Sequence, residues 1–219
     1  MSGLFITFEG TEASGKSTQI NLLAGRLRSL GYIVRTLREP GGTPIGEEIR
    51  HTLKHSRQNA AMTPETELLL MNASRAQLVR EVIRPALAHG EIVLCDRFYD
   101  STTAYQGFGR QLDPSLVRTT IDLAVGSTRP DLTLLLWVPT EVSAERQSTR
   151  QSSGPPVRDR FEEADAVFFE RVVRGYEAIA EAEPKRLRRV DATGDPEFVS
   201  AAIWSVVQSV LPPATGRPS

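Results

Sequence analysis

The sequence is poor in the residues that mark extracellular, zinc-binding or membrane-embedded proteins. Its single cysteine, Cys95, excludes an internal disulfide, and its three histidines are too scattered to suggest a zinc site. The N-terminal residues lack a charged segment followed by a long apolar one, and nowhere do ~18 apolar residues run together, as a membrane helix requires. We therefore expect a cytoplasmic protein, in a reducing compartment, without a signal peptide or a membrane span.

The chain also lacks an excess of charge of either sign. Its formal net charge is −1, so we expect no overall attraction to nucleic acid or to an anionic membrane, and any basic site must be local. The 219 residues suit one large domain, and the composition is ordinary for a globular protein. We predict a single domain over residues 1–211 and a disordered tail over residues 212–219.

Short apolar runs rich in β-branched residues alternate with helical patterns along the chain. The predicted strands are residues 4–8, 33–37, 91–96, 132–138 and 186–192. The predicted helices are residues 17–30, 65–88, 169–179 and 198–210. Such alternation indicates βαβ units, and strands that are apolar throughout are typical of a sheet covered on both faces. We predict the α/β class, with a mostly parallel five-stranded sheet and helices on both faces.

A phosphate-binding pattern follows the first predicted strand. Residues 10–17 read GTEASGKS, which matches G-x-x-x-x-G-K-[ST] between a strand and a helix. Glycines allow backbone N–H groups to curl around an anion, and the helix N-terminus adds partial positive charge. Lys16 would reach the β- and γ-phosphates, and Ser17 would hold Mg²⁺. The pattern predicts a nucleoside triphosphate, but it does not separate a GTPase, a transport ATPase and a small-molecule kinase.

Three further segments each admit a functional and a structural interpretation. Arg50 follows a Pro-Gly-Gly turn and is either an anion ligand or a surface arginine. Asp96 and Arg97 close the third strand, where ligands bind in such sheets, but they would also suit a structural ion pair. Residues 146–160 carry four arginines, which suits either a lid that closes over phosphates or a solvated face.

The N-K-x-D pattern that recognises guanine is absent, which argues against a switch GTPase. Arg50 and Arg97 lie outside residues 10–17, the predicted phosphate cradle, and would serve a second anion. A second anion site suggests that the acceptor itself carries phosphate. The residues alone therefore indicate an enzyme similar to a nucleoside monophosphate kinase.

Several segments, in order, resemble the thymidylate kinase family over nearly the whole chain. They are FITFEGTEASGKST, LREPGGTPIGEEIR, ASRAQLVREVIRPAL, DRFYDSTTAYQGFGR, RPDLTLLLWV, RDRFEE and VDAT. The resemblance implies a P-loop nucleoside monophosphate kinase fold with a mobile lid at about residues 146–160. It also implies transfer of the γ-phosphoryl group of ATP to dTMP, with Mg²⁺, to give dTDP. The expected form is a homodimer without nucleic-acid or membrane partners.

The resemblance also implies roles for matching positions. Those expected to bind ATP are Gly10, Thr11, Glu12, Ala13, Ser14, Gly15, Lys16, Ser17, Thr18, Asp191, Ala192 and Thr193. Those expected to bind dTMP are Glu12, Glu39, Arg50, Met71, Arg75, Arg97, Ser101, Thr102, Tyr105 and Gln106. Those expected at the metal are Ser17 and Asp96. Among them Arg50 and Arg97 would grip the acceptor phosphate, and Tyr105 would leave no room for a 2′-hydroxyl.

The cradle has no arginine, whereas the lid segment has several. In this respect the chain is similar to the bacterial members of the family, in which the catalytic arginine comes from the lid. The catalytic groups would then be Lys16, Arg97 and one or more of Arg150, Arg158 and Arg160.

Met71 departs from the family pattern, in which a phenylalanine at this position usually stacks on the base. A methionine can also pack on a ring through its sulfur, so the choice of base stays open. The lid segment also looks longer than usual. Two alternatives remain at this stage: a kinase for another nucleoside monophosphate such as dUMP, and an ATP-binding module without catalysis.

Overall fold

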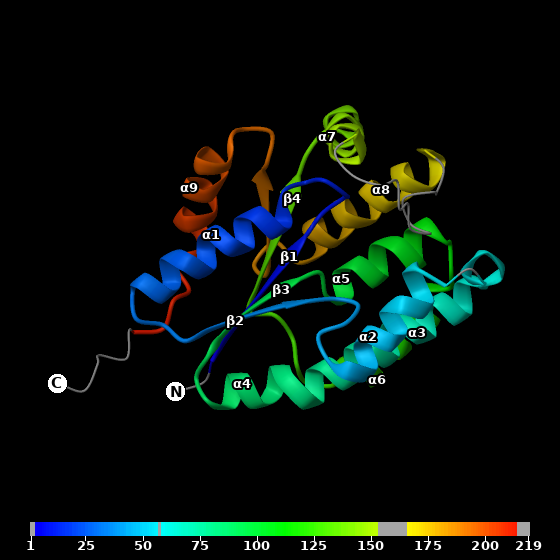
Figure 1. The fold of residues 1–219 in the computed structure, drawn as a ribbon, viewed down its shortest axis with the longest axis horizontal. Helices are drawn as coiled ribbons and strands as arrows, with labels where there is room; N and C mark the ends of the chain where they lie inside the picture. The colour runs from blue at the N-terminus through cyan, green and yellow to red at the C-terminus, as the bar shows by residue number, and fades with distance from the viewer. Residues whose placement is uncertain (1–2, 57, 153–165, 214–219) are drawn as a thin grey trace.

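The computed structural model describes residues 3–56, 58–152 and 166–213, apart from the side chains of residues 147 and 150–152. Its centre is a parallel sheet with the order β2-β3-β1-β4-β5 (Figure 1). The strands are β1 (Leu4–Glu9), β2 (Val34–Arg38), β3 (Ile92–Asp96), β4 (Leu132–Trp137) and β5 (Leu187–Asp191). The predicted fold class is confirmed, and each pairing between these strands is parallel.

The burial of each strand follows from its place in the sheet. All six residues of β1, the central strand, are buried, whereas the edge strand β2 has no buried residue. The central strands are mostly apolar because helices cover both of their faces, and their polar residues Thr7, Glu9 and Thr133 are buried as well. Since all strands run the same way, their carboxyl ends meet at one edge, which is where the loops after β1 and β3 come together.

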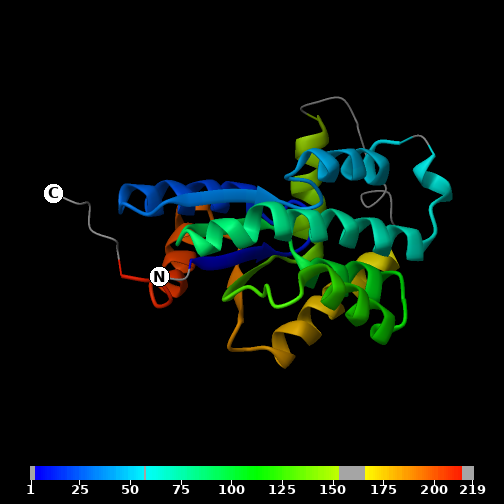
Figure 2. The same cartoon turned by 90° about the horizontal axis from the view of Figure 1, so that it is seen from below.

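Helices flank the sheet on both sides. They are α1 (Lys16–Ser29), α2 (Pro44–Lys54), α3 (Pro64–Leu78), α4 (Arg84–Ala88), α5 (Tyr99–Thr102), α6 (Pro114–Val125), α7 (Thr140–Ser152), α8 (Ala166–Ala182) and α9 (Pro196–Val207). One core cluster joins the sheet to α1 and α9, and a second joins it to α3, α4 and α6 (Figure 1). A third cluster joins residues of α2, α3 and α8 to β4 and β5, and Figure 2 shows α2 beside α3.

The helix predicted over residues 65–88 is not one regular helix. A π-helical turn, η2 (Val79–Ile83), separates α3 from α4. Pro85 lies at the start of α4 and has no backbone N–H, so it cannot donate the bond that a continuous α-helix would need there. A second π-helical segment, η3 (Thr103–Gly109), continues α5, in the polar run that follows β3.

The lid prediction lies partly outside the described residues. Residues 146–152 form the last part of the α-helix α7 and do not form a loop. Arg158 and Arg160 fall in the undescribed range 153–165, and the side chain of Arg150 is not described either. Of the predicted tail, residues 214–219 are likewise outside the described part of the chain.

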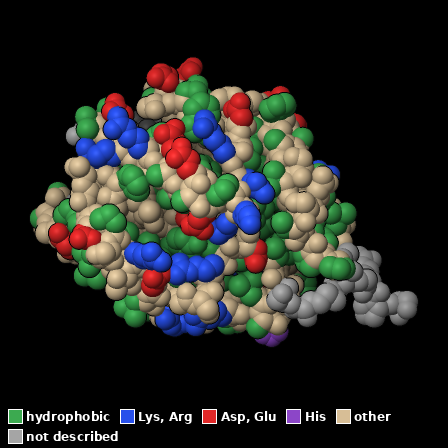
Figure 3. All heavy atoms as spheres, turned by 180° about the vertical axis from the view of Figure 1, so that it is seen from behind, with side chains coloured by type: hydrophobic (Ala, Val, Ile, Leu, Met, Phe, Trp, Pro, Cys, Tyr) green, Lys and Arg blue, Asp and Glu red, His purple; other side chains and the backbone are tan. Residues whose placement is uncertain are grey.

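On the face shown in Figure 3, basic and acidic side chains are interspersed with apolar ones. This distribution agrees with the net charge of −1. Among the helices in the described ranges, none has the length and apolar character needed to cross a bilayer.

Candidate active site

The loop between β1 and α1 has the backbone of a phosphate cradle. Gly10 and Gly15 have φ angles of 135° and 90°, and Ala13 has a φ of 53°. These angles lie in the left-handed region, where glycine is favoured. A side chain at Gly10 would also place its Cβ 2.4 Å from the carbonyl oxygen of Leu136 on β4. The glycine that opens the pattern is therefore required by the close approach of two strands.

Lys16, the first residue of α1, is folded back onto this loop. Its Nζ donates to the carbonyl oxygens of Gly10 (3.2 Å) and Thr11 (2.8 Å) and to Ser14 Oγ (3.3 Å). Burial, together with the charge of Arg97, lowers the pKa of Lys16 from 10.5 to about 8. A phosphate bound in the loop would add negative charge beside this buried ammonium and favour its charged form.

Ser17 and Asp96 bring two oxygen atoms together between α1 and the end of β3. Ser17 Oγ donates to Asp96 Oδ2 at 2.9 Å, on the cleft side of the sheet. Hard cations such as Mg²⁺ prefer oxygen ligands and keep several waters and substrate oxygens. In the described ranges there is no cluster of three or more His, Cys, Asp or Glu side chains that could hold a metal alone. The pair therefore fits a Mg²⁺ that is shared with phosphates.

Arg97 places its guanidinium between the cradle and η3. Its Nη1 donates to the Gly10 carbonyl (2.9 Å) and to Ser101 Oγ (3.1 Å), and its Nη2 donates to Glu12 Oε1 (2.7 Å) and to the Tyr105 hydroxyl (3.3 Å). Burial would raise the pKa of Glu12, but nearby positive charges, with Arg97 the strongest, outweigh it and hold the pKa at about 2. Glu12 is thus a carboxylate that keeps the guanidinium oriented.

The backbone at Arg97 is held in an unfavourable conformation by Glu9. Arg97 has a φ of 69°, in the left-handed region that a side chain rarely adopts. Glu9, the fully buried last residue of β1, accepts hydrogen bonds from Phe98 N (2.7 Å), Ser101 Oγ (2.6 Å) and the Tyr176 hydroxyl (3.1 Å). These contacts fix the turn after β3 against the end of β1, and they point the Arg97 side chain into the cleft.

Glu9 should make the stability of the fold depend on pH. Burial and the nearby Asp100 carboxylate raise the pKa of Glu9 from 4.5 to about 7. Because the folded chain binds this proton more tightly, the stabilisation is full below pH 4.5 and is lost as the pH rises through 7. We expect the unfolding free energy of the native chain, relative to Glu9→Gln, to fall by on the order of 3 kcal/mol over that range. Urea unfolding of both chains at a series of pH values measures this change. A difference in unfolding free energy that stays constant with pH would contradict the raised pKa of Glu9.

Arg50 approaches the same cleft from α2. Its Nη1 donates to the carbonyl oxygen of Pro40 at 2.9 Å, and Arg38 donates to the same oxygen at 3.1 Å. Arg38 is also paired with Glu47 at 2.9 Å, and it lines the cleft together with Arg50 and Arg97. The structure therefore places Arg50 and Arg97 at one cavity with the cradle.

This cleft has a volume of about 700 Å³. The predicted residues that line it are Glu12, Ala13, Ser14, Gly15, Lys16, Ser17, Thr18, Glu39, Arg50, Asp96 and Arg97. Lining residues that the sequence did not suggest are Arg38, Lys54 and His55, and Arg146 of the predicted lid segment also lines the cleft. One cavity thus joins the predicted phosphate cradle, metal pair and acceptor arginines.

The predicted base-binding residues form a buried layer behind the cleft. Arg75, which is 1% exposed, pairs with Glu39 (Nη2–Oε2, 2.7 Å) and donates to Thr102 Oγ1 (2.9 Å). Burial raises the pKa of Glu39 in spite of this partner. Met71 and Tyr105 pack in the same apolar cluster. The layer is continuous with the cleft, because Glu39 lines the cleft as well.

The predicted adenine segment is tied to the cradle through α7. Arg146 donates to the carbonyl oxygens of Ala192 (2.9 Å) and Thr193 (3.1 Å), and Asp191 accepts from Thr193 N at 2.9 Å. Ser143 Oγ, one turn earlier on α7, donates to the Glu12 carbonyl oxygen at 2.7 Å. Arg146 therefore supports the 191–193 turn, a contact that the lid prediction did not include.

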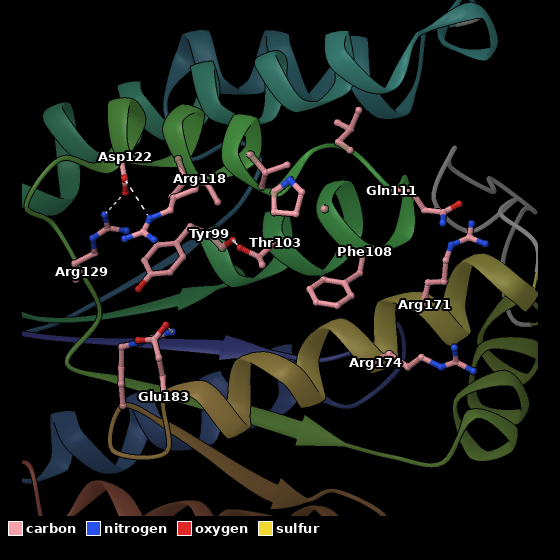
Figure 4. Close-up of a pocket in the computed structure, with 16 residues that line it drawn as sticks. Tyr99, Thr103, Phe108, Gln111, Arg118, Asp122, Arg129, Arg171, Arg174 and Glu183 are labelled. Atoms are coloured by element: carbon pink, nitrogen blue, oxygen red, sulfur yellow. Dashed lines mark hydrogen bonds and ion pairs between the residues drawn. The ribbon is translucent and has the colours of Figure 1, made fainter.

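A larger cavity, of about 1000 Å³, lies elsewhere, between α6 and α8 (Figure 4). Its wall includes Tyr99 and Phe108, and none of the predicted nucleotide-binding residues lines it in the described part of the chain. Arg118 and Arg129 both face Asp122, so part of its basic charge is neutralised within the wall (Figure 4). The predicted nucleotide-binding residues therefore gather at the smaller cleft and not at this cavity.

Two residues that shape the site were not predicted. Glu9 ends a buried strand beside the cradle, and a carboxylate at that position was a signal that could have been followed. Tyr176 donates to Glu9 from a point 167 residues further along the chain. Its place on an apolar helix face gave no sign of this role.

Comparisons with known proteins identify the same family that the sequence motifs resemble. The sequence model of the thymidylate kinase family matches residues 8–203. The chain is 49% identical to a thymidylate kinase of Thermomicrobium roseum, over 94% of this chain and 95% of that protein. It is 48% identical to one of Syntrophotalea carbinolica, over 94% and 96%. The crystal structure of thymidylate kinase from Ehrlichia chaffeensis aligns with a TM-score of 0.75 at 34% identity, covering 95% of this chain and 99% of that one.

Proposed function

Because the chain belongs to the thymidylate kinase family, we propose that it transfers the γ-phosphoryl group of ATP to dTMP and releases dTDP and ADP. The observation that carries the proposal is the single cleft in which Lys16 of the cradle and the pair Arg50 and Arg97 all take part. Lys16 suits the donor phosphates, and the pair Arg50 and Arg97 suits the phosphate of an acceptor.

The reaction follows from charge and position. The phosphate of dTMP is already anionic, so its oxygen can attack without a general base, and catalysis consists of alignment and neutralisation of charge. Lys16 neutralises the donor side, and Arg97, held by Glu12, neutralises and orients the acceptor phosphate. Mg²⁺ held near Ser17 and Asp96 would supply further positive charge to the donor phosphates.

The buried layer provides the groups for the nucleoside of dTMP. Arg75 and Thr102 would contact the thymine ring, Met71 would pack on it, and Tyr105 would lie under the deoxyribose. Supporting this, Tyr105 already lies beside the Arg97 guanidinium, 5.0 Å from ring centre to carbon. The acceptor phosphate and its sugar would then occupy adjacent parts of the cleft.

A lid arginine should supply the charge that appears in the transition state, because the cradle itself has no arginine. We expect one of Arg150→Ala, Arg158→Ala and Arg160→Ala to lower kcat by roughly 10³-fold, with little change in the KM for dTMP. Steady-state kinetics of the three variants identify it. Arg146→Ala is the contrast, because loss of its contacts to residues 192–193 should raise the KM for ATP. Near-native kcat in all three lid variants would contradict this prediction.

We also propose a cytoplasmic homodimer, with residues 1–211 acting as one kinase domain. Leu69 on α3 and Leu123 on α6 are 60% and 77% exposed, and these two packed helices offer an apolar face to a second copy. Sedimentation equilibrium tests this, because a single-chain mass would exclude the dimer.

The activity is tested by measuring ADP release with ATP, Mg²⁺ and a panel of nucleoside monophosphates and nucleosides. The proposal predicts turnover with dTMP, weaker turnover with dUMP, and none with thymidine, which has no phosphate for Arg50 and Arg97. Turnover that prefers dUMP would indicate the alternative acceptor that Met71 left open. Absence of turnover with every acceptor would indicate an ATP-binding module and would overturn the proposal.

A further inference from the structure

We propose that Glu67, outside the set of residues predicted for catalysis or binding, is a positioning residue that selects the pyrimidine base by fixing the orientation of the Gln106 side-chain amide. The inference rests on the proposed function. Glu67 lies on α3 and is fully buried, with 0% of its surface exposed. A buried carboxylate is costly unless it is paired and hydrogen-bonded, so Glu67 depends on the side chains that hold it in this place.

The position of Glu67 follows from helical spacing. Glu67, Met71 and Arg75 are four residues apart and lie on one face of α3. Thr102 and Gln106 are likewise four residues apart, on the facing segment formed by α5 and η3. Arg75 donates to Thr102 at 2.9 Å, and one turn away Gln106 Nε2 donates to Glu67 Oε1 at 2.9 Å. Glu67 thus closes the end of the layer assigned to the base.

The carboxylate is held in place by Arg110. Arg110 Nε donates to Glu67 Oε1 (3.2 Å) and its Nη2 to Oε2 (3.0 Å), which is the two-point pairing of a guanidinium with an ionised carboxyl. An ionised carboxylate can only accept hydrogen bonds. Gln106 must therefore turn its NH₂ toward Glu67, and its Oε1 is directed elsewhere.

That oxygen is the group available for a base. Gln106 is fully buried, and its Oε1 has no hydrogen-bond partner among the described residues. A buried acceptor without a donor is costly, and a ligand N–H would satisfy it. Thymine and uracil present an imide N3–H donor, whereas N3 of cytosine is an acceptor. The amide orientation set by Glu67 therefore favours thymine over cytosine.

The test compares two acceptors that differ only in this ring edge, dTMP and 5-methyl-dCMP. In Glu67→Gln the side chain can donate as well as accept, so the Gln106 amide can flip and present its NH₂. We expect the ratio of kcat/KM for dTMP over 5-methyl-dCMP to fall roughly tenfold, which corresponds to one hydrogen bond. Glu81→Gln is the matched control, because Glu81 accepts from the Gln77 amide at 2.7 Å on the exposed side, and its ratio should be native.

A second variant keeps the test decisive if Glu67→Gln does not fold. The exchange Glu67→Gln with Gln106→Glu retains one carboxylate near Arg110 and returns an obligatory acceptor to position 106, so it should keep the native preference for dTMP. A ratio that is unchanged in a folded Glu67→Gln variant, with both activities reduced equally, would show a structural role only and overturn the proposal. Loss of the preference for dTMP in the exchanged pair would also overturn the proposal. A native chain inactive with dTMP would instead overturn the proposed function.

Discussion

Replacing Lys16 with alanine should lower kcat by roughly 10³-fold while leaving the affinity for dTMP within a few-fold of native. The ammonium lies among the Gly10 and Thr11 carbonyl oxygens and Ser14, at the centre of the loop that would surround the donor phosphates. The charge that develops on the transferring group would lose its nearest cation. The acceptor groups Arg50 and Arg97 should stay in place, because the Pro40 carbonyl oxygen holds Arg50, and Glu12, Ser101 and the Tyr105 and Tyr176 hydroxyls hold Arg97.

The measurement is steady-state ADP release together with dTMP binding by calorimetry. Lys185→Ala is the matched control, because Lys185 is an exposed lysine between α8 and β5 and its loss should leave both quantities unchanged. Near-native kcat in Lys16→Ala would remove the cradle from the mechanism. Equal loss of turnover and of dTMP binding would indicate collapse of the loop instead.

Replacing Arg97 with methionine should lower kcat/KM for dTMP by roughly 10²- to 10³-fold, because a partly buried charge that binds an anion is removed. The guanidinium makes contacts to Gly10, Glu12, Ser101 and Tyr105 that aim it at the cleft. Without it, Glu12 loses the partner that does most to lower its pKa, and a second anion would face the acceptor phosphate.

Two further variants separate charge from geometry. Arg97→Lys keeps the charge but not the planar fork, so it should recover only a small part of the loss. Arg35→Met removes a surface arginine that also pairs at two points with a glutamate, Glu91, and it should be silent. Full recovery by lysine would mean that charge alone positions the acceptor. A silent Arg97→Met would assign the acceptor phosphate to Arg50 alone.

The parts of the fold that could be predicted are those fixed by local pattern. The five strands were found within one or two residues, because short apolar runs rich in β-branched residues alternate with helical patterns along the chain. α7 was missed because its sequence, TEVSAERQSTRQS, has almost no apolar face. The contacts that hold α7 come from Ser143 and Arg146 to distant backbone oxygens, and no helical period reveals them.

In the candidate site, too, local patterns could be predicted and contacts between distant elements could not. The cradle could be predicted, since the glycines, Lys16 and Ser17 follow one another in a pattern with a fixed backbone geometry. Arg50 and Arg97 could be singled out as groups for a second anion, but the role of Arg75 and the identity of the acceptor came from resemblance, because many arginines in the chain have equivalent local surroundings. Glu9 and Glu67 depend on partners from other elements, so only the folded chain shows what they hold.

The central claim is that one cleft holds both phosphates, so that the γ-phosphoryl group of ATP passes to dTMP and not to water. Incubation with dTMP, Mg²⁺ and ATP carrying ¹⁸O on the γ-phosphoryl group, followed by mass spectrometry of the products, tests this directly. The structure predicts one dTDP for each ADP, with the label in the terminal phosphoryl group of dTDP. Label recovered in inorganic phosphate, with dTMP unchanged, would contradict it.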